Sequence, residues 1–151
     1  MYQNWPANIT VVAATVVAIS SAVLVHYEGL LLLSARLQRA RGPRRIRVLY
    51  GILSLLGLHV CEIWIFGVVS WMLLQWPANG HIATPATVVH TGLFDAIYLS
   101  AVTFSTVGFG DLAPVGPIRF LFGTEALAGL VLIGWSASFT YLEMERFWRN
   151  G

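Results

Sequence analysis

The residues of this chain with the clearest chemistry are T-V-G-F-G-D, at positions 106–111. Gly108 and Gly110 alternate with Val107 and Phe109, and glycine adopts backbone conformations that are closed to other residues. The alternation predicts that successive carbonyl groups turn to the same side and that the two apolar side chains pack on the other side. Four copies around an axis would form stacked rings of oxygens, which can replace the water shell of a bare cation.

Long apolar runs must position this segment. Residues 9–35, 48–74 and 118–142 each exceed the roughly 20 residues that cross the hydrocarbon core of a bilayer. Charged residues make up 11% of the 151 residues, against about 25% in soluble domains, and apolar residues make up 57%. The composition therefore excludes a water-soluble domain and predicts one all-α unit with three transmembrane helices.

A shorter apolar run comes directly before the T-V-G-F-G-D segment. Residues 93–105 are too few to span a bilayer and suit a re-entrant helix, and Asp95 near their start favours a helix N-terminus. Residues 75–92, which precede them, are rich in turn formers and predict an exposed loop. Backbone that is not helical is tolerated at membrane depth only where protein buries it or where it lines a watery cavity. We therefore expect the segment to line such a cavity.

The nine basic residues are all arginines, and six of them lie between Arg36 and Arg47, in the predicted loop that joins the first two spans. The positive-inside rule places this loop in the cytoplasm, so the N-terminus lies outside and the C-terminus lies inside. An arginine-rich loop next to a bilayer is expected to contact anionic lipid. A nucleic-acid partner is not expected, because apolar spans flank the loop on both sides.

The T-V-G-F-G-D segment closely resembles the selectivity-filter signature of potassium channels. Residues 94–141 are similar to the complete pore module of that family, with a pore helix, a filter and an inner helix. The resemblance implies a potassium-selective ion channel, not an enzyme, in which four identical chains each supply one quarter of the filter. It also implies that the carbonyls of the first four filter residues, with the Thr106 hydroxyl, coordinate dehydrated K+. The implied filter residues are Thr106, Val107, Gly108, Phe109 and Gly110.

The surroundings of the filter depart from the family pattern at one position. Some family members carry a glutamate four residues before the filter threonine, where this chain has Val102, so Asp111 needs another partner. Tyr98, one helical turn earlier, is a candidate hydrogen-bond donor to Asp111, with simple packing as the alternative. Ser105 and Glu125 are further candidates for filter support. Because a charge within a span is costly, Glu125 would either brace the pore helix or be protonated.

The third span carries two glycines that could form a gating hinge. Pro117 suits the first turn of a helix, and an inner helix is predicted over residues 117–148. Gly129 matches, with a one-residue gap, the glycine at which the inner helices of family members bend, and Gly134 is the next candidate. Glycine also permits the close approach of another helix, so packing against the pore helix is the alternative.

Four ionisable side chains lie within the first two spans: His26, Glu28, His59 and Glu62. They are expected to meet at a similar depth, because the two spans are antiparallel and joined by a short loop. Leaving them unpaired in a bilayer would be costly. Three interpretations stay open: a clasp of glutamate–histidine hydrogen bonds, a proton or pH sensor, and a transition-metal site such as zinc on His26 and His59 with carboxylates.

The predicted organisation has two parts. Residues 1–47 form a peripheral transmembrane helix and the basic cytoplasmic loop, and residues 48–151 form a pore domain that assembles as a homotetramer in a cell membrane, for which a bacterial inner membrane fits best. Within the pore domain the predicted elements are an outer helix at 48–74, an extracellular loop at 75–92, a pore helix at 93–105, the filter at 106–111 and an inner helix at 117–148.

Three other functions are compatible with the same topology. A non-selective cation channel would pass sodium as well as potassium. A metal- or proton-handling membrane protein would use His26, Glu28, His59 and Glu62, with the pore module inert. An auxiliary subunit of a larger channel is the third alternative.

Overall fold

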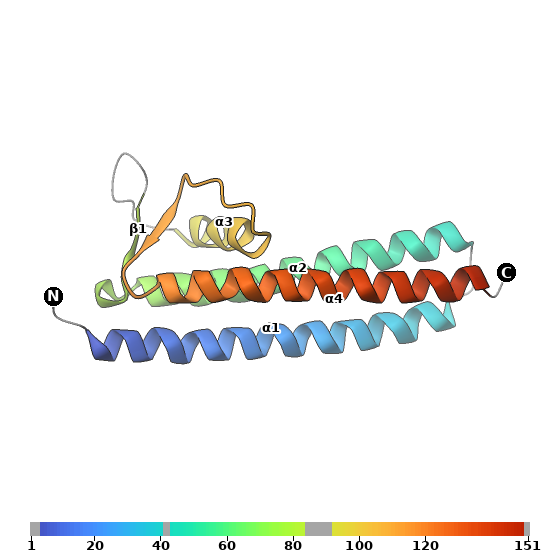
Figure 1. The fold of residues 1–151 in the computed structure, drawn as a ribbon, viewed down its shortest axis with the longest axis horizontal. Helices are drawn as coiled ribbons and strands as arrows, with labels where there is room; N and C mark the ends of the chain where they lie inside the picture. Colours follow the sequence, from blue (N-terminus) through green and yellow to red (C-terminus); the bar gives the residue numbers. More distant parts are fainter. Residues whose placement is uncertain (1–3, 41–42, 84–91, 150–151) are drawn as a thin grey trace.

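The computed structural model describes residues 4–40, 43–83 and 92–149. Three long helices run side by side and are long and apolar enough to cross a membrane (Figure 1). They are α1 (Trp5–Arg39), α2 (Arg44–Leu74) and α4 (Arg119–Arg149). The predicted fold class, an all-α membrane protein with three spanning helices, is confirmed.

The first helix is longer than the apolar run that predicted it. The side-chain oxygen of Asn4 accepts a hydrogen bond from the backbone N–H of Ala7 at 3.4 Å, and Pro6 lies in the first turn. The arginines Arg36 and Arg39 lie in the last turn, where positive charge is favourable beside the helix dipole. Polar residues that suit helix ends thus extend α1 beyond its membrane core.

The arginine-rich connection is mostly helical, which corrects the prediction of a loop over residues 36–47. The helix α1 continues to Arg39, and α2 begins at Arg44 directly after Pro43. Arginine is a good helix former, whereas proline is tolerated only near the start of a helix. Residues 41–42 lie outside the described part of the chain.

A short helix lies beside the bundle at the end that carries the N-terminus (Figure 1). This helix, α3 (Leu93–Phe104), is one residue shorter than the predicted re-entrant helix. The side chain of Asp95 accepts a hydrogen bond from the backbone N–H of Gly92 at 3.0 Å, which stabilises the helix start. The helix is apolar and too short to span.

A two-stranded antiparallel sheet flanks α3. One strand lies within the predicted loop at 75–92, and the other follows the predicted filter at 106–111. Its strands are β1 (His81–Ala83) and β2 (Ala113–Val115), and a 3-10 turn, η1 (Pro77–Asn79), precedes β1. Asn79 ties this sheet to the bundle, because its carbonyl accepts a hydrogen bond from the N–H of Ile118 at 2.8 Å, directly before α4. Residues 84–91 of the predicted loop lie outside the described residues.

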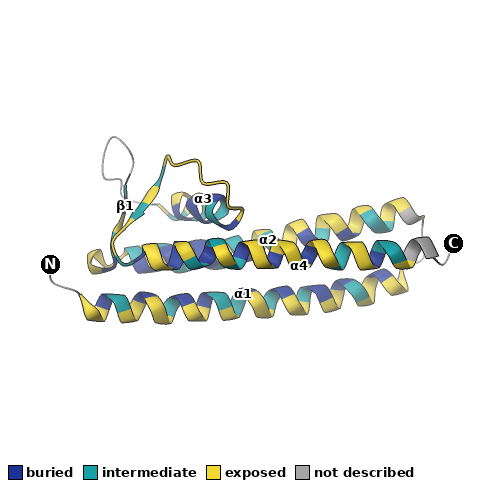
Figure 2. Ribbon diagram, in the orientation of Figure 1, coloured by how far each residue is buried: buried dark blue, intermediate teal, exposed yellow. Residues whose placement is uncertain are grey.

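The bundle buries one stripe of each long helix and exposes the rest (Figure 2). On α1 the buried stripe recurs every three or four residues and is rich in alanine in its first half, which permits close helix packing. Its members are Ala7, Val11, Thr15, Ala18, Ala22, His26, Leu30, Leu33 and Leu37. Large apolar side chains such as Val16, Val17 and Leu24 point outward and are exposed, as expected for a helix whose solvent is lipid.

Candidate functional site

The backbone of the T-V-G-F-G-D segment alternates in conformation. Thr106, Gly108 and Gly110 have positive φ angles of 59°, 53° and 78°, whereas Val107 and Phe109 between them do not. Such alternation groups successive N–H groups on one side of the chain and successive carbonyl groups on the other. A positive φ at threonine is strained by about 1 to 3 kcal/mol, so the surrounding structure must hold this residue in place.

Two backbone hydrogen bonds hold the start of the segment against α3. The N–H of Thr106 donates to the carbonyl of Thr103 at 2.9 Å, and the N–H of Gly108 donates to the carbonyl of Val102 at 3.0 Å. These bonds use the N–H groups of the segment and not its carbonyl groups. Val102, where some potassium channels have glutamate, therefore anchors the segment through its backbone.

The two apolar side chains of the segment are uncovered in a single chain. Val107 is 56% exposed and Phe109 is 70% exposed. Exposed apolar surface of this kind is available for packing against other molecules or lipid.

Asp111, at the end of the segment, is paired with α3. The hydroxyl of Tyr98 donates to Oδ2 of Asp111 at 2.8 Å, and Oδ1 accepts from the N–H of Leu112 at 3.1 Å. The hydrogen bond to Asp111 raises the pKa of Tyr98, because the carboxylate stabilises the protonated hydroxyl. The structure thus shows the hydrogen bond that the sequence offered as one of two alternatives for Tyr98, and its role in supporting a filter stays a prediction.

The two other candidate support residues differ in their surroundings. The hydroxyl of Ser105, the residue directly after α3, donates to the carbonyl of Ala101 at 2.7 Å, and a role of Ser105 in supporting a filter stays a prediction. Glu125 is fully buried on α4 and forms a hydrogen bond with Ser100 of α3, whose hydroxyl lies 2.9 Å from the carbonyl of Ile63. A hydroxyl has one hydrogen to donate. Both bonds are satisfied when Ser100 donates to Ile63 and a protonated Glu125 donates to Ser100.

The two glycines proposed as a hinge have unlike environments. A Cβ atom at Gly129 would lie 2.1 Å from the carbonyl oxygen of Phe104, so only glycine allows α4 to approach the end of α3 this closely. A Cβ atom at Gly134 would meet nothing within 4 Å. The helix α4 is continuous from Arg119 to Arg149 across both positions. The geometry explains Gly129 by packing, and hinge motion at Gly129 or Gly134 stays a prediction.

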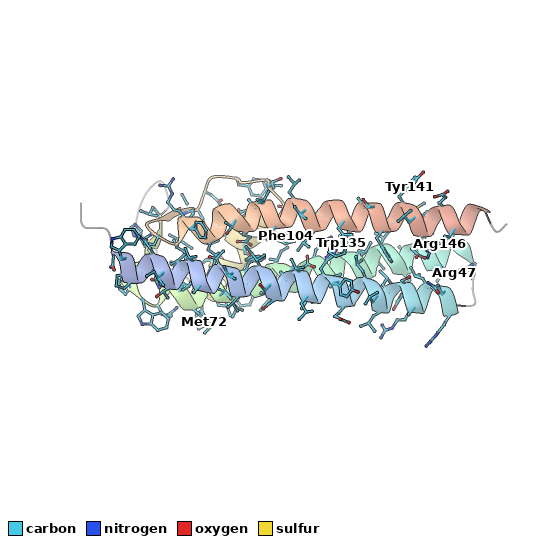
Figure 3. The ribbon with its side chains drawn as sticks, turned by 60° about the horizontal axis from the view of Figure 1, so that its bottom comes forward. Arg47, Met72, Phe104, Trp135, Tyr141 and Arg146 are labelled. Atoms are coloured by element: carbon cyan, nitrogen blue, oxygen red, sulfur yellow. The ribbon has the colours of Figure 1, made fainter. Side chains whose placement is uncertain are left out.

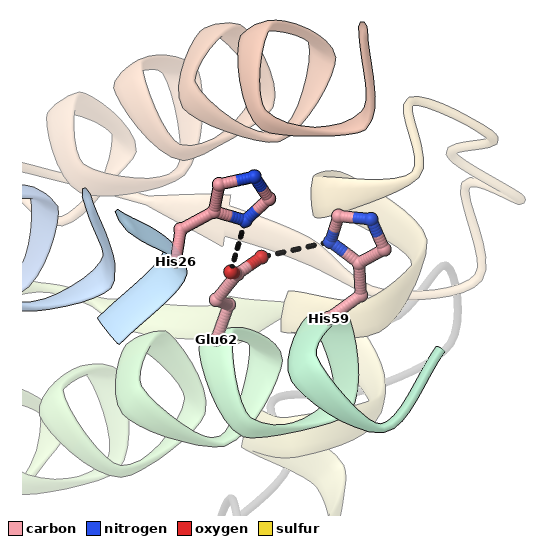
Figure 4. Close-up of side chains that lie close together, drawn as sticks. All are labelled: His26, His59 and Glu62. Atoms are coloured by element: carbon pink, nitrogen blue, oxygen red, sulfur yellow. Dashed lines mark hydrogen bonds and ion pairs between the residues drawn. The ribbon is translucent and has the colours of Figure 1, made fainter. Parts of the chain in front are cut away.

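Three of the four ionisable residues of the first two spans form one buried group, which we call the His–His–Glu cluster: His26, His59 and Glu62 (Figure 4). Nδ1 of His26 lies 2.7 Å from Oε1 of Glu62, and Nδ1 of His59 lies 2.8 Å from Oε2. His59 and Glu62 are three residues apart on α2 and so share a face. The cluster links α1 to α2 and contains ligand types that could hold a metal ion.

Glu28 is not a member of the cluster, which corrects the expectation that all four residues meet. It is exposed on α1. It follows His26 by two residues, which turns its side chain by roughly 200° around the helix axis and away from α2. Position along the helix predicts depth, whereas contact with Glu62 also requires the matching face of α1.

Several residues that shape these sites escaped the sequence analysis. Ser100 bonds to Glu125, and the rings of Phe104 and Trp135 lie 5.8 Å from His59 and 5.1 Å from His26, respectively. Their residue types are ordinary for a membrane helix. Only their helical spacing relative to the polar residues could have singled them out.

Three spanning helices and a short apolar helix that ends in an exposed backbone segment define the architecture of a membrane channel. A family model described as "Ion channel" matches residues 58–144, from the middle of α2 to the last turns of α4. The match covers more than half of the 151 residues. The chain therefore belongs to this family of ion channels and is a multi-pass membrane protein.

The curated relatives match a smaller part of the chain. Protein LctB of Geobacillus stearothermophilus is 41% identical over 68 residues, and protein LctB of Bacillus caldotenax is 37% identical over 68 residues. Each match covers 41% of this chain and 49% of the relative, so the chain spans about half the length of these relatives. An uncharacterized protein of Methanothermus fervidus is 45% identical over 47 residues, which is 31% of this chain and 7% of that protein. No solved structure matches the chain.

Proposed function

We propose that the chain is a subunit of a potassium-selective channel and that the T-V-G-F-G-D segment is its selectivity filter. The observation that carries this proposal is the alternation of positive φ at Thr106, Gly108 and Gly110, at the end of a short helix in an ion-channel family. This backbone offers successive carbonyl groups on one side, and rings of carbonyls are the ligands that replace water around K+ in such filters. Permeation is passive.

The channel is a homotetramer in this proposal. The exposed side chains of Val107 and Phe109 and an uncovered apolar face of α4 support it, because neighbouring copies would cover them. That face comprises Phe120, Leu127, Leu130, Val131 and Tyr141. Residues 48–151 form the conducting unit, and α1 lies at its periphery, outside the region that the family model matches.

The membrane orientation follows from the two ends of the bundle. Arg47 and Arg146 lie at one end and Met72 lies toward the other, with Phe104 and Trp135 between them (Figure 3). By the positive-inside rule, the arginine end is cytoplasmic. The N-terminus and the T-V-G-F-G-D segment then face the outside, and the arginines around residues 36–47 contact anionic lipid of a cell membrane, for which a bacterial inner membrane fits best.

Reversal potentials of the purified protein in planar bilayers test the proposed selectivity. With K+ on one side and Na+ on the other, we expect a reversal potential close to the potassium equilibrium value, and block by barium. A reversal potential near zero would indicate the non-selective cation channel instead. The absence of any current from correctly assembled protein would contradict a conducting function.

The mass of the purified protein in detergent tests the assembly separately. Native mass spectrometry should give four times the 16.6 kDa mass of the chain. A stable monomer would contradict the proposed filter, because one chain supplies only one quarter of the oxygens.

A further inference from the structure

We propose that the His–His–Glu cluster is a binding site for a divalent transition metal, with Zn2+ as the ion that its ligand types fit best. The site would lie between α1 and α2, away from the proposed ion path through the T-V-G-F-G-D segment. It would bind its ion whether or not the chain conducts potassium. The inference therefore stands apart from the proposed function.

The three ligand atoms have the identity and spacing of a zinc site. One ring nitrogen of His26, one ring nitrogen of His59 and a carboxylate oxygen of Glu62 lie within 4.8 Å of one another. Two histidines and one glutamate are a known set of zinc ligands in sites that keep a fourth position open for water. Side chains on facing helices, with two ligands three residues apart on one of them, are a common way to build metal sites in helical bundles.

Metal binding would require the ligand atoms to rearrange. The nitrogen–oxygen distances are 2.7 and 2.8 Å, and they run to different oxygens of Glu62. Ligand atoms of a tetrahedral zinc site, at about 2.0 to 2.1 Å from the metal, are separated by roughly 3.3 Å. Each of these two pairs must therefore open by about half an ångström, and the ligand atoms of the three residues, which lie within 4.8 Å of one another, must all reach that separation.

The second nitrogen of His26 is an unpartnered polar atom of the cluster. Nε2 points away from Glu62 (Figure 4), is buried and has no hydrogen-bond partner among the described residues. A buried polar atom without a partner is costly, so the hydrogen bonds to Glu62 do not satisfy every polar atom of the cluster. The ring centroid of Trp135 lies 5.1 Å from that of His26.

The charge of Glu62 also favours a cation at this place. Its side chain is fully buried, and a carboxylate at membrane depth needs a positive partner. In the described part of the chain, its hydrogen-bond partners are the two histidines, neither of which is permanently charged. The side chain of His59 is 16% exposed, which leaves one edge of the cluster open to an entering ion.

A bound metal would fix the position of α1 relative to α2 and to the end of α3, which leads into the T-V-G-F-G-D segment. The ring of His59 lies 5.8 Å from that of Phe104, the last residue of α3. Coordination would fix His59 against His26 and so hold α1, α2 and the end of α3 in one arrangement.

Titration of the metal-free protein in detergent with Co2+ tests the site, because tetrahedral Co2+ gives visible absorption bands. We expect one Co2+ per chain, displacement by Zn2+, and a higher melting temperature with either ion. The variants His59→Gln and Glu62→Gln should bind Co2+ at least about tenfold more weakly. Circular dichroism verifies that both variants fold.

Two matched variants serve as controls. His81→Gln removes an exposed histidine of β1, and Glu28→Gln removes an exposed glutamate of α1. Both should bind Co2+ like the unaltered chain. Folded wild-type protein that binds neither Co2+ nor Zn2+ would overturn the proposal, as would wild-type affinity in both cluster variants. The cluster would then be a hydrogen-bonded clasp, and the selectivity measured in bilayers would be unaffected by that result.

Discussion

The T-V-G-F-G-D segment and the His–His–Glu cluster both place polar groups at membrane depth, but in different ways. The segment uses backbone groups held by Thr103 and Val102, and leaves Val107 and Phe109 exposed. The cluster uses side chains from two helices of one chain, and its Glu62 is fully buried. The comparison teaches that the segment leaves apolar side chains uncovered in a single chain, whereas the cluster is closed by contacts between two helices of that chain.

The largest effect on ion flux is expected from Gly108→Ala, which alters the segment only by restricting its backbone conformation. Gly108 has a φ of 53°, and a Cβ there would meet nothing within 4 Å, so the substitution introduces conformational strain without a clash inside the chain. We expect loss of K+ flux in liposomes. Gly57→Ala is the matched control, because it also adds a Cβ in open space but lies in α2. Unchanged flux in Gly108→Ala would refute the importance of this backbone.

Substitution within the His–His–Glu cluster should lower the stability of the chain more than it alters ion conduction. Glu62→Ala leaves the Nδ1 groups of His26 and His59 without their acceptor, and we expect it to lower the free energy of unfolding by about 2 to 4 kcal/mol. Denaturation in detergent, followed by circular dichroism, measures the change. Glu28→Ala, on the exposed face of the same bundle, should change it by about 0.5 kcal/mol or less. Equal changes in the free energy of unfolding for Glu62→Ala and Glu28→Ala would contradict the prediction that only Glu62 contributes strongly to stability.

Gly129→Ala probes the contact between α4 and the end of α3, which leads into the T-V-G-F-G-D segment. Its Cβ would lie 2.1 Å from the Phe104 carbonyl oxygen, and the overpacking should cost about 1 to 3 kcal/mol of stability. Gly134→Ala, in the same helix with open space around it, should leave stability unchanged or slightly raised. If Gly134 is a hinge, its substitution will alter flux without lowering stability. The prediction fails if Gly134→Ala is the more destabilising of the two.

The smallest effect is expected from Tyr98→Phe, which removes the hydrogen bond to Asp111 and keeps the ring. The raised pKa of Tyr98 means that the hydroxyl stays protonated below about pH 10, and the bond is lost only as the pH rises through the folded-state value. Selectivity for K+ over Na+ in the wild type should fall as the pH rises through the raised pKa of Tyr98. Tyr98→Phe should be modestly less selective throughout and lack the alkaline fall; an identical fall in the variant would exclude Tyr98 as its cause.

The sequence predicted the helices well because their signal is local. Apolar runs of fixed length predicted the three spans, and the thirteen residues before Thr106 predicted α3 to within one residue. The alternation of glycine with larger residues also anticipated the alternation of φ, since glycine has few alternatives at a positive φ. The helix ends were less accurate, because capping by Asn4 and the helix propensity of arginine extend α1 and α2 past their apolar cores.

Features that depend on direction or on distant partners were missed. Glu28 and His26 are two residues apart on α1 but point to different sides of the helix. Their positions along the span predict their depth and not the direction of their side chains. The β1–β2 pair joins residues about thirty positions apart in a register that no local pattern specifies. The bond between Ser100 and Glu125 likewise required knowledge of how α3 and α4 cross.

The close contact between Gly129 and the carbonyl of Phe104 has a mechanical consequence. Phe104 is the last residue of α3, two positions before Thr106. Because Gly129 has no side chain, α4 packs directly against the backbone of α3 at this point. A tilt or rotation of α4 about this point must push the backbone from which the T-V-G-F-G-D segment begins. Movement of α4 and displacement of the first residues of this segment would then be mechanically coupled.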